Sequence, residues 1–233
     1  MENNEISISL CFPAFNEEAN IKEAISSSVT VLDKISSDWE IIVVDDGSSD
    51  TTAEIVEKIA LSEKRVRLLR HDKNRGYGAA LKSGFYSATK QWIWLNASDN
   101  QFNPEDIYEL LPYTQDYEVI SGYRFNRADP LYRKINARLY HLFIYAVLGL
   151  NLKDMDCGFK LIRSDVFKVI ALKSEGALID AEFFAKCEKQ GFKVKEVMVG
   201  HKPRRHGTQT GASVFVIAKM FVEVFKLKMR ENL

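Results

Sequence analysis

The sequence has few cysteines, and their spacing already excludes two classes of protein. Only three of the 233 residues are cysteine, at Cys11, Cys157 and Cys187. These wide separations fit neither a zinc site nor a disulfide framework, so we expect a protein of a reducing compartment. The apolar neighbours of Cys11 and Cys187 predict that both are small residues of the core.

Net charge and long hydrophobic runs are also lacking. The 32 basic residues cancel the 32 acidic ones, which leaves no overall positive field for a nucleic-acid partner. No apolar run approaches the roughly 20 residues that a membrane-spanning helix needs. The N-terminus, Met-Glu-Asn-Asn-Glu, lacks the basic and then apolar pattern of a signal peptide. We therefore expect a cytoplasmic protein that binds no nucleic acid and is soluble or peripheral at a membrane.

Apolar runs alternate with helical patterns along the first half of the chain. Strands are predicted at 6–12, 40–44, 66–69, 92–95 and 117–121, and helices at 17–32, 52–62, 78–89 and 104–111. This alternation predicts an α/β fold with a mostly parallel sheet flanked by helices. We expect Pro13 to end the first strand, and Asp50 or a nearby hydroxyl to cap the second helix.

The second half of the chain has a less regular pattern. We expect a helix up to residue 148, a strand at 157–163, a helix at 180–190 stopped by Gly191, a half-exposed strand at 193–199 and an amphipathic C-terminal helix at 212–230. Neither a repeat nor a low-complexity linker interrupts the chain. A single domain, 1–233, is therefore expected.

Two polar loops follow predicted strands, at the edge of the sheet where α/β proteins bind ligands. Asp45 directly ends the second strand, so its carboxylate can accept hydrogen bonds from a base or a ribose. A simple turn is the alternative, because Asp-Asp-Gly-Ser also favours turns. Gly76 and Gly78 lack the spacing of a dinucleotide fingerprint. We expect these glycines to let the chain turn tightly against a ligand or a strand.

A third loop, after the run Trp92–Leu95, carries oxygen ligands. Asp99 and Gln101 lie between that strand and Pro104, which opens the next helix. A turn is again the alternative. Mg²⁺ or Mn²⁺, however, is held by a few carboxylate or amide oxygens while a diphosphate completes the shell. The loop therefore predicts a minimal metal site that needs the phosphates of a substrate.

Six motifs occur in order along the chain: Phe12-Pro-Ala-Phe-Asn-Glu-Glu18, Val43-Val-Asp-Asp-Gly-Ser-Ser-Asp50, Asn74-Arg-Gly-Tyr-Gly78, Ala97-Ser-Asp-Asn-Gln101, Asp156-Cys-Gly-Phe-Lys160 and His201-Lys-Pro-Arg-Arg-His-Gly207. With them, from about Ile6 to Val216, the chain resembles a family-2 glycosyltransferase of GT-A (Rossmann-like) fold, in particular the dolichol- or polyprenyl-phosphate mannose and glucose synthases. The resemblance implies an inverting enzyme that moves a sugar from a GDP- or UDP-linked donor to a polyprenyl or dolichyl phosphate. It also implies Mg²⁺ or Mn²⁺ as cofactor.

The resemblance further implies roles for single residues. Nucleotide-sugar-binding residues are expected at Pro13, Phe15, Glu17, Val43, Asp45, Ala97, Ser98, Asp99, Gln101 and Arg204. Asp99 and Gln101 would face the metal ion. Catalytic residues are expected at Asp99, Arg124, Arg133, Asp154 and Arg204, where the arginines would hold donor or acceptor phosphates. Residues 1–121 would form the nucleotide-binding half, and 122–233 the acceptor half with the C-terminal helix.

Departures from the family pattern leave rival functions open. Ala97 replaces the first Asp of the family's Asp-x-Asp, although Asn96 beside it can partly substitute, and Thr210 stands where a lysine is frequent. A non-catalytic nucleotide-sugar-binding relative is therefore one alternative. A hydroxyl-directed transferase of surface polysaccharide synthesis is another, and an NAD-dependent oxidoreductase is a distant third.

A hydroxyl acceptor would need a carboxylate to take its proton. The candidates for that base are Asp154, Asp156, Asp180 and Glu182, and a position on a helix surface is the alternative for the last two.

The run Leu139–Leu148 is apolar and follows a cluster of basic residues. That order suits an interfacial segment near anionic headgroups, and the C-terminal helix could lie beside it. A buried core helix is the alternative. If the acceptor is a lipid phosphate, Arg124 and Arg133 would position it, and we expect the protein to be peripheral at the inner face of the membrane.

Overall fold

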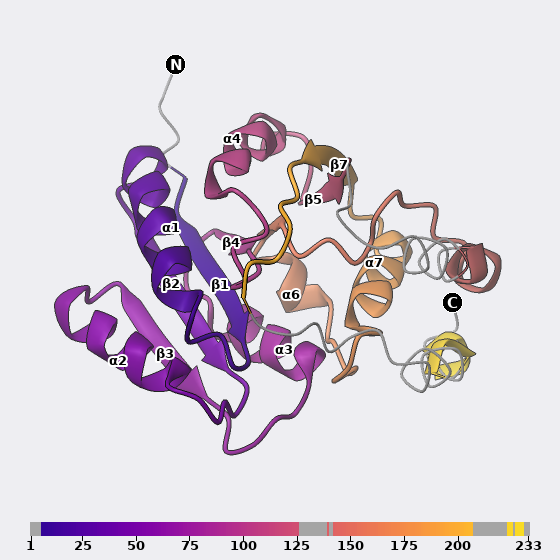
Figure 1. Cartoon of the computed structure of the whole chain (residues 1–233). Helices are drawn as coiled ribbons and strands as arrows, with labels where there is room; N and C mark the ends of the chain where they lie inside the picture. Colours follow the sequence, from indigo (N-terminus) through magenta and orange to yellow (C-terminus); the bar gives the residue numbers. More distant parts are fainter. Residues whose placement is uncertain (1–5, 126–138, 140–141, 207–222, 226, 231–233) are drawn as a thin grey trace.

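A seven-stranded sheet forms the centre of the computed structural model, which describes residues 6–125, 139, 142–206, 223–225 and 227–230. The strand order is β3-β2-β1-β4-β6-β5-β7 (Figure 1). Strand β6 is antiparallel to both of its neighbours, and the other described pairings are parallel. The expected α/β fold with a mostly parallel sheet is therefore confirmed.

The elements follow the predicted order. The strands are β1 (Ile8–Ala14), β2 (Trp39–Asp45), β3 (Val66–Arg70), β4 (Trp92–Leu95), β5 (Val119–Arg124), β6 (Lys160–Arg163) and β7 (Val194–Val199). The helices are α1 (Ile21–Ile35), α2 (Thr52–Ser62), α3 (Tyr77–Ser87), α4 (Ile107–Leu110), α6 (Val166–Val169) and α7 (Ile179–Lys189), with 3₁₀ turns η1 (Pro104–Asp106) and η2 (Leu111–Tyr113) around α4. Residues 142–148 are also helical. The short helix α6 was not expected.

Strand β1 does not end at Pro13, which corrects the prediction. Pro13 pairs with Val44 of β2, and the strand continues to Ala14. On the other side of β1 the pairing with β4 stops at Cys11. Pro13 therefore lies where one side of the strand has no ladder partner, so its missing N–H group costs little.

The capping prediction for α2 needs a correction, because the N-cap is Thr51, whose side chain makes no capping hydrogen bond. Asp50, one residue earlier, accepts the N–H of Thr52 with its Oδ1 at 3.0 Å. The expected end of α7 is confirmed. Gly191, just after α7, has a φ of +74°, the conformation in which glycine stops a helix.

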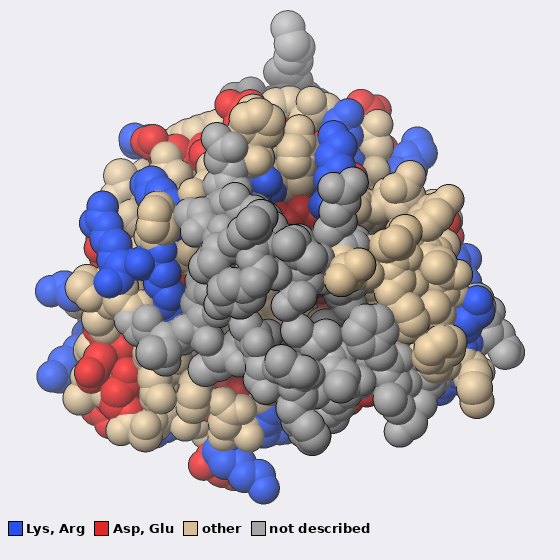
Figure 2. Space-filling model, turned by 45° about the vertical axis from the view of Figure 1, so that its right-hand side comes forward, with Lys and Arg blue, Asp and Glu red and all other residues tan. Residues whose placement is uncertain are grey.

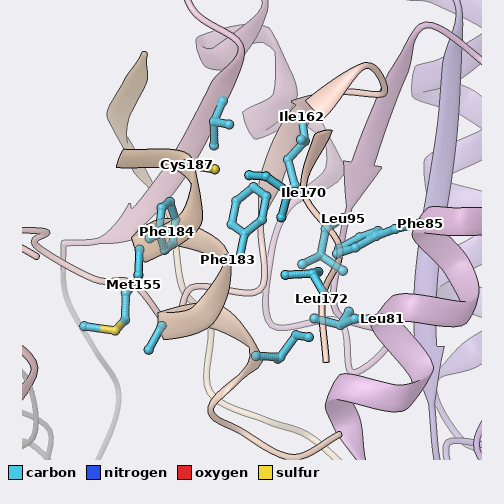
Figure 3. Close-up of a cluster of buried hydrophobic side chains, with 14 of the residues drawn as sticks. Leu81, Phe85, Leu95, Met155, Ile162, Ile170, Leu172, Phe183, Phe184 and Cys187 are labelled. Atoms are coloured by element: carbon cyan, nitrogen blue, oxygen red, sulfur yellow. The ribbon is translucent and has the colours of Figure 1, made fainter. Parts of the chain in front are cut away.

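The sheet separates two apolar cores, because successive side chains of a strand point to opposite faces. Helices α1, α2 and α4 pack with Leu10 and Phe12 on one face. Helices α3, α6 and α7 pack with Cys11 and Leu95 on the other (Figure 3). All three cysteines are buried and free, which confirms the core position expected for Cys11 and Cys187.

The helical stretch 142–148 lies beside the C-terminal helix. The rings of Phe143 and Phe225 are 5.5 Å apart, and Lys228 Nζ donates to the carbonyl of Val147 at 2.6 Å. Ile144 and Leu227 are buried in the core on the α7 face. The basic residues Arg127, Arg133, Lys134 and Arg138 lie outside the described residues, as does 207–222, with Thr210 and the first part of the predicted C-terminal helix.

The distribution of surface charge and the length of the helices agree with the zero net charge and the short apolar runs of the sequence. Basic and acidic side chains are interspersed over the described part of the face in Figure 2. In the described ranges, every helix is too short or too polar to cross a membrane.

Gly78, in the first turn of α3, packs against the loop that contains Glu175 and Gly176, and this contact can be tested. A Cβ at this position would lie 2.8 Å from the carbonyl carbon of Glu175 and 2.8 Å from the oxygen of Gly176. We expect Gly78→Ala to lower the free energy of unfolding by about 1–3 kcal/mol, because the backbone of the neighbouring loop must move. Urea denaturation measures the change.

Gly176→Ala is the matched control, since a Cβ there meets nothing within 4 Å. Equal stability of the two variants would show that α3 does not pack against this loop as described.

Candidate active site

A cavity of about 420 Å³ opens at the carboxyl ends of the parallel strands. Its walls come from segments that follow β1, β2, β3, β4 and β7. The lining residues are Pro13, Ala14, Phe15, Glu17, Asp46, Asn74, Gly76, Tyr77, Ala80, Ala97, Ser98, Asp99 and Arg204. This is the edge of an α/β sheet at which ligands bind.

The cavity brings together most of the residues predicted to bind the nucleotide sugar: Pro13, Phe15, Glu17, Ala97, Ser98, Asp99 and Arg204. Three others are not among its lining. Val43 is fully buried in the core. Asp45 is also fully buried; its Oδ1 accepts the N–H of Ser48 at 3.1 Å, and its Oδ2 lies 3.4 Å from Arg70 Nε. Gln101 is buried too, and its Nε2 donates to the carbonyl of Lys202 at 3.0 Å.

Arg204 carries the positive charge of the cavity. Its Nη2 lies 2.5 Å from Glu17 Oε1 and its Nη1 lies 3.4 Å from Asp99 Oδ2. Its Nε donates to the carbonyl of His206 at 2.7 Å. The guanidinium thus joins the segment after β7 to the loops after β1 and β4. An anion that enters the cavity meets a planar cation with several N–H donors.

Glu17 is held from two sides. Its Oε2 accepts a hydrogen bond from Asn20 Nδ2 at 2.6 Å, while Oε1 pairs with Arg204. Burial raises the pKa of Glu17, although Asn20 and Arg204 oppose the shift. Removal of the positive charge of Arg204 would therefore favour the protonated carboxyl further.

Asp99 is the carboxylate of the cavity that can hold a metal ion. Its Oδ1 accepts the N–H of Gln101 at 3.2 Å, and its Oδ2 faces Arg204. The side chain of Ala97 offers no oxygen, and the hydroxyl of Ser98 donates to the carbonyl of Pro13. Within the part of the chain that is described, no three His, Cys, Asp or Glu residues form a metal-binding group. One carboxylate fits Mg²⁺ or Mn²⁺ when substrate phosphates and water complete the shell.

Asn96 is the expected partial substitute for the missing Asp. It is 3% exposed, and its Oδ1 has no hydrogen-bond partner among the described residues. It is not among the residues that line the cavity. The metal ligand that the cavity itself offers is therefore Asp99.

Asp46, rather than Asp45, lines the cavity, and sequence reasoning missed it. Asp46 Oδ1 accepts the N–H of Arg75 at 2.9 Å and lies 2.6 Å from His71 Nδ1, while Oδ2 accepts the N–H of Gly76 at 2.8 Å. The carboxylate therefore holds the loop that leads into α3 and supplies Asn74, Gly76 and Tyr77 to the cavity. The adjacent pair Asp45-Asp46 is the sequence feature that could have indicated Asp46. Neighbouring side chains at a strand end point to opposite sides, so only one of the two carboxylates can face the site.

Arg124 and Asp154 bind each other instead of lining the cavity. Arg124 Nε lies 2.6 Å from Asp154 Oδ2 and Nη2 lies 2.7 Å from Oδ1, a bidentate pair. Burial by itself lowers the pKa of Arg124, but the contact with Asp154 outweighs it and the net shift is upward. Arg133 lies outside the described residues.

Asp180 and Glu182 do not lie on a helix surface, which corrects the alternative considered for both. Asp180 Oδ1 lies 2.8 Å from Lys160 Nζ, and both side chains are buried. Burial raises the pKa of Asp180 to about 6, against the opposing effect of Lys160. Glu182 is fully buried and pairs with Lys186 at 2.8 Å and Arg230 at 3.2 Å. The reason is that the first turn of α7 faces the core, so its carboxylates require buried cations.

Comparison with known proteins adds independent findings. The family model described as glycosyl transferase family 2 matches residues 9–171. Among curated proteins, an undecaprenyl-phosphate 4-deoxy-4-formamido-L-arabinose transferase of Pectobacterium atrosepticum is 30% identical over 92% of this chain and 65% of that protein. The corresponding protein of Aeromonas hydrophila is 29% identical over 95% of this chain and 68% of that protein. The chain thus spans about 65% of the length of the first of these relatives.

Solved structures share the fold. Glucosyl-3-phosphoglycerate synthase of Mycobacterium tuberculosis, crystallised with Mn²⁺, uridine diphosphate and phosphoglyceric acid, gives a TM-score of 0.72 at 18% identity, over 97% of this chain and 78% of that one. The same protein with Mn²⁺, UDP-glucose and phosphoglyceric acid gives a TM-score of 0.71 at 19% identity, over 98% of this chain and 80% of that one. These matches support the GT-A fold that the motifs implied.

The role of Asp46 can be tested through the loop that it holds. We expect Asp46→Ala to speed the hydrogen exchange of the Arg75 and Gly76 amides by at least about tenfold, since both lose their acceptor. Exchange measured by NMR reads the two positions directly. Asp72→Ala, at an exposed position of the same connection, is the control and should leave them unchanged. Unaltered protection in Asp46→Ala would contradict the assignment.

Proposed function

The chain belongs to glycosyl transferase family 2, and from that premise we propose that it transfers a sugar from a nucleoside-diphosphate sugar to a polyprenyl phosphate. The curated relatives are named as transferases of undecaprenyl phosphate, which supports this acceptor. The single observation that carries the proposal is the cavity in which Asp99, Glu17 and Arg204 meet at the strand ends. Residues 1–121 would act as the nucleotide-binding half and 122–233 as the acceptor half.

The nucleoside would lie against the aromatic side of the cavity. Phe15 and Tyr77 both line it, and each remains 37% exposed. Flat, partly exposed rings offer a surface against which a base or ribose can pack. The loop held by Asp46 would form the neighbouring wall, and its backbone would fix the position of Tyr77.

The diphosphate would lie at the charged side. Asp99 would hold Mg²⁺ or Mn²⁺ together with the substrate phosphates, and a bound ion would neutralise charge on the leaving diphosphate. A solved structure of similar fold contains Mn²⁺ and uridine diphosphate, which supports both groups here. Arg204 would exchange its contact with Asp99 for the phosphates and stabilise the charge that develops on them.

In the proposed reaction, an oxygen of the acceptor phosphate attacks the anomeric carbon. The bond from that carbon to the β-phosphate oxygen breaks, and the nucleoside diphosphate leaves with the electron pair. Attack from the opposite face inverts the anomeric centre. An acceptor phosphate is already anionic, so the protein need not remove a proton.

The placement of the candidate bases favours a phosphate acceptor over a hydroxyl. None of Asp154, Asp156, Asp180 and Glu182 is among the residues that line the cavity. Asp154 is paired with Arg124, Asp180 with Lys160 and Glu182 with Lys186. A general base must lie within hydrogen-bond reach of the proton that it removes. A reaction that needs no base suits this site better.

Exposed apolar side chains support contact with a membrane. Those on the helical stretch 142–148, on the described C-terminal helix and at residue 139 are Leu139, Leu142, Tyr145, Phe225 and Met229, each more than half exposed. We refer to these residues as the apolar patch. Two adjacent helices with such a face, and with Lys228 and Arg230 exposed nearby, suit the interface of an anionic membrane. The protein would then work at the cytoplasmic face of the membrane that holds the lipid.

Asp99 tests the proposed reaction. A set of GDP- and UDP-sugars is first screened for thermal stabilisation of the protein with Mn²⁺, and the best donor is then assayed for transfer to undecaprenyl phosphate. We expect Asp99→Asn to reduce turnover on the order of 100-fold, because it removes the charge that would hold the metal. Asp165→Asn, at the exposed N-cap of α6, is the control.

Full turnover in Asp99→Asn would refute the metal role. Donor binding without transfer to any polyprenyl phosphate would instead favour a non-catalytic nucleotide-sugar-binding relative.

The apolar patch gives a second test. We expect Leu142→Gln with Met229→Gln to weaken sedimentation with anionic phospholipid vesicles at least about tenfold, since two apolar side chains lose their place in the lipid. Leu61→Gln, at a 75% exposed leucine of α2, is the control and should bind like the unchanged protein. Equal binding of all three proteins would exclude the patch as the membrane contact.

A further inference from the structure

A second cavity, of about 540 Å³, lies between strand β3 and helix α3. We refer to it as the β3–α3 groove. Strand β3 is one of the two edge strands of the described sheet, so the groove opens at the side of the molecule. Its lining residues are Leu68, Leu69, Arg70, His71, Arg75, Ala79, Lys82, Ser83, Tyr86 and Ser87, and none of them lines the candidate active site.

The charged side chains that line the groove are all basic. Arg70 and Arg75 are each 49% exposed, and Lys82 is 18% exposed. They come from both walls, since Arg70 ends β3 and Lys82 belongs to α3. Three cations that converge on one concave surface form an electrostatic site for an anion, whereas single lysines scattered over a surface do not.

The acidic partners of these cations leave most of their donors available. Arg70 Nε lies 3.4 Å from Asp45, which is fully buried behind it. Arg75 Nη2 and Lys82 Nζ lie 3.7 Å and 3.9 Å from the same carboxylate oxygen of Glu175, too far for hydrogen bonds. Lys82 uses one of its N–H groups on the carbonyl of Lys173 at 3.2 Å. Charge-assisted hydrogen bonds to a phosphate would therefore replace long, weak contacts.

The floor of the groove is held in place. His71 Nε2 lies 2.9 Å from Ser83 Oγ, and its Nδ1 lies 2.6 Å from Asp46 Oδ1. Both ring nitrogens are thus engaged, so the imidazole joins β3 to α3 at a fixed separation. The hydroxyl of Tyr86 accepts the N–H of Leu172 at 2.8 Å, which holds the Tyr86 side chain in place. A binding surface that is already ordered loses little entropy when a ligand arrives.

We propose that the β3–α3 groove binds a soluble, phosphate-bearing small molecule, with its phosphate held by Arg70, Arg75 and Lys82. The volume exceeds that of a phosphate alone and lies in the range of small-molecule sites. The ligand is soluble because the groove lies at the β3 edge, whereas the helices of the apolar patch lie at the other side of the molecule (Figure 1).

The experiment is a calorimetric titration of the whole chain with inorganic pyrophosphate, without divalent metal. It is done in an Arg204→Gln background, which removes the cation of the candidate active site. Sugar donor and acceptor are both absent, so the result does not depend on the proposed function. We expect binding to persist in Arg204→Gln and to weaken at least about tenfold when Arg75→Gln and Lys82→Gln are added. These two positions leave the buried Asp45 untouched, and circular dichroism checks that the variant is folded.

Lys58→Gln with Lys64→Gln is the matched control, because it removes the same charge from exposed positions outside the groove. It should change the dissociation constant by less than about twofold. An equal loss in the control would show a general charge effect and overturn the proposal. Absence of pyrophosphate binding in Arg204→Gln would overturn it too, since the anion would then belong to the active site alone. Arg70→Gln provides a second groove variant, and it should weaken binding in the same direction.

Discussion

The candidate site depends on one geometric constraint, which is that parallel strands end at the same edge of a sheet. Segments as distant as Pro13, Asp46, Asn74 and Asp99 meet there because β1 to β4 all run in the same direction. Strand β6 is antiparallel to β4, so its first residue, Lys160, pairs with Leu95 at the end of β4. The motif that ends at Lys160 therefore also reaches this edge.

Charge pairing then decides which of these residues remain available for chemistry. Lys160 and Asp180, and Arg124 and Asp154, are buried pairs whose members satisfy each other. Arg204 differs because it is shared between two carboxylates and lies in a cavity. A shared cation can change partners at low cost, since one contact is retained while the other is replaced. A lysine would offer a single nitrogen and could not span the two carboxylates in this way.

The sequence identified the elements whose signal is local and missed those whose signal is not. Apolar runs such as Trp92–Leu95 marked the buried strands correctly, and Gly191 marked the end of α7. The prediction that Pro13 ends the first strand is wrong because a proline is tolerated there. The reason is that the pairing of β1 with β4 stops before Pro13, and the sequence of β1 alone does not show where that pairing stops. A helix surface is the wrong interpretation for Asp180 and Glu182, because the cations that pair with them are not evident from the sequence. Lys160 is distant from Asp180 along the chain, and Lys186 lies four residues after Glu182 within the same helical pattern. Asp46 was missed because only the fold decides which of two adjacent carboxylates faces the site.

Glu182 also links the C-terminal helix to the loop that packs against α3. It accepts the N–H groups of Lys173 and Ser174 and pairs with Arg230 of the C-terminal helix. The next residue of that loop is Glu175, whose carbonyl accepts the N–H of Ala79 in the first turn of α3. A single carboxylate thus connects the C-terminal helix to the wall of the cavity. A truncation before Arg230, for crystallisation or fusion, would therefore remove the ion pair that links the C-terminal helix to the wall of the cavity.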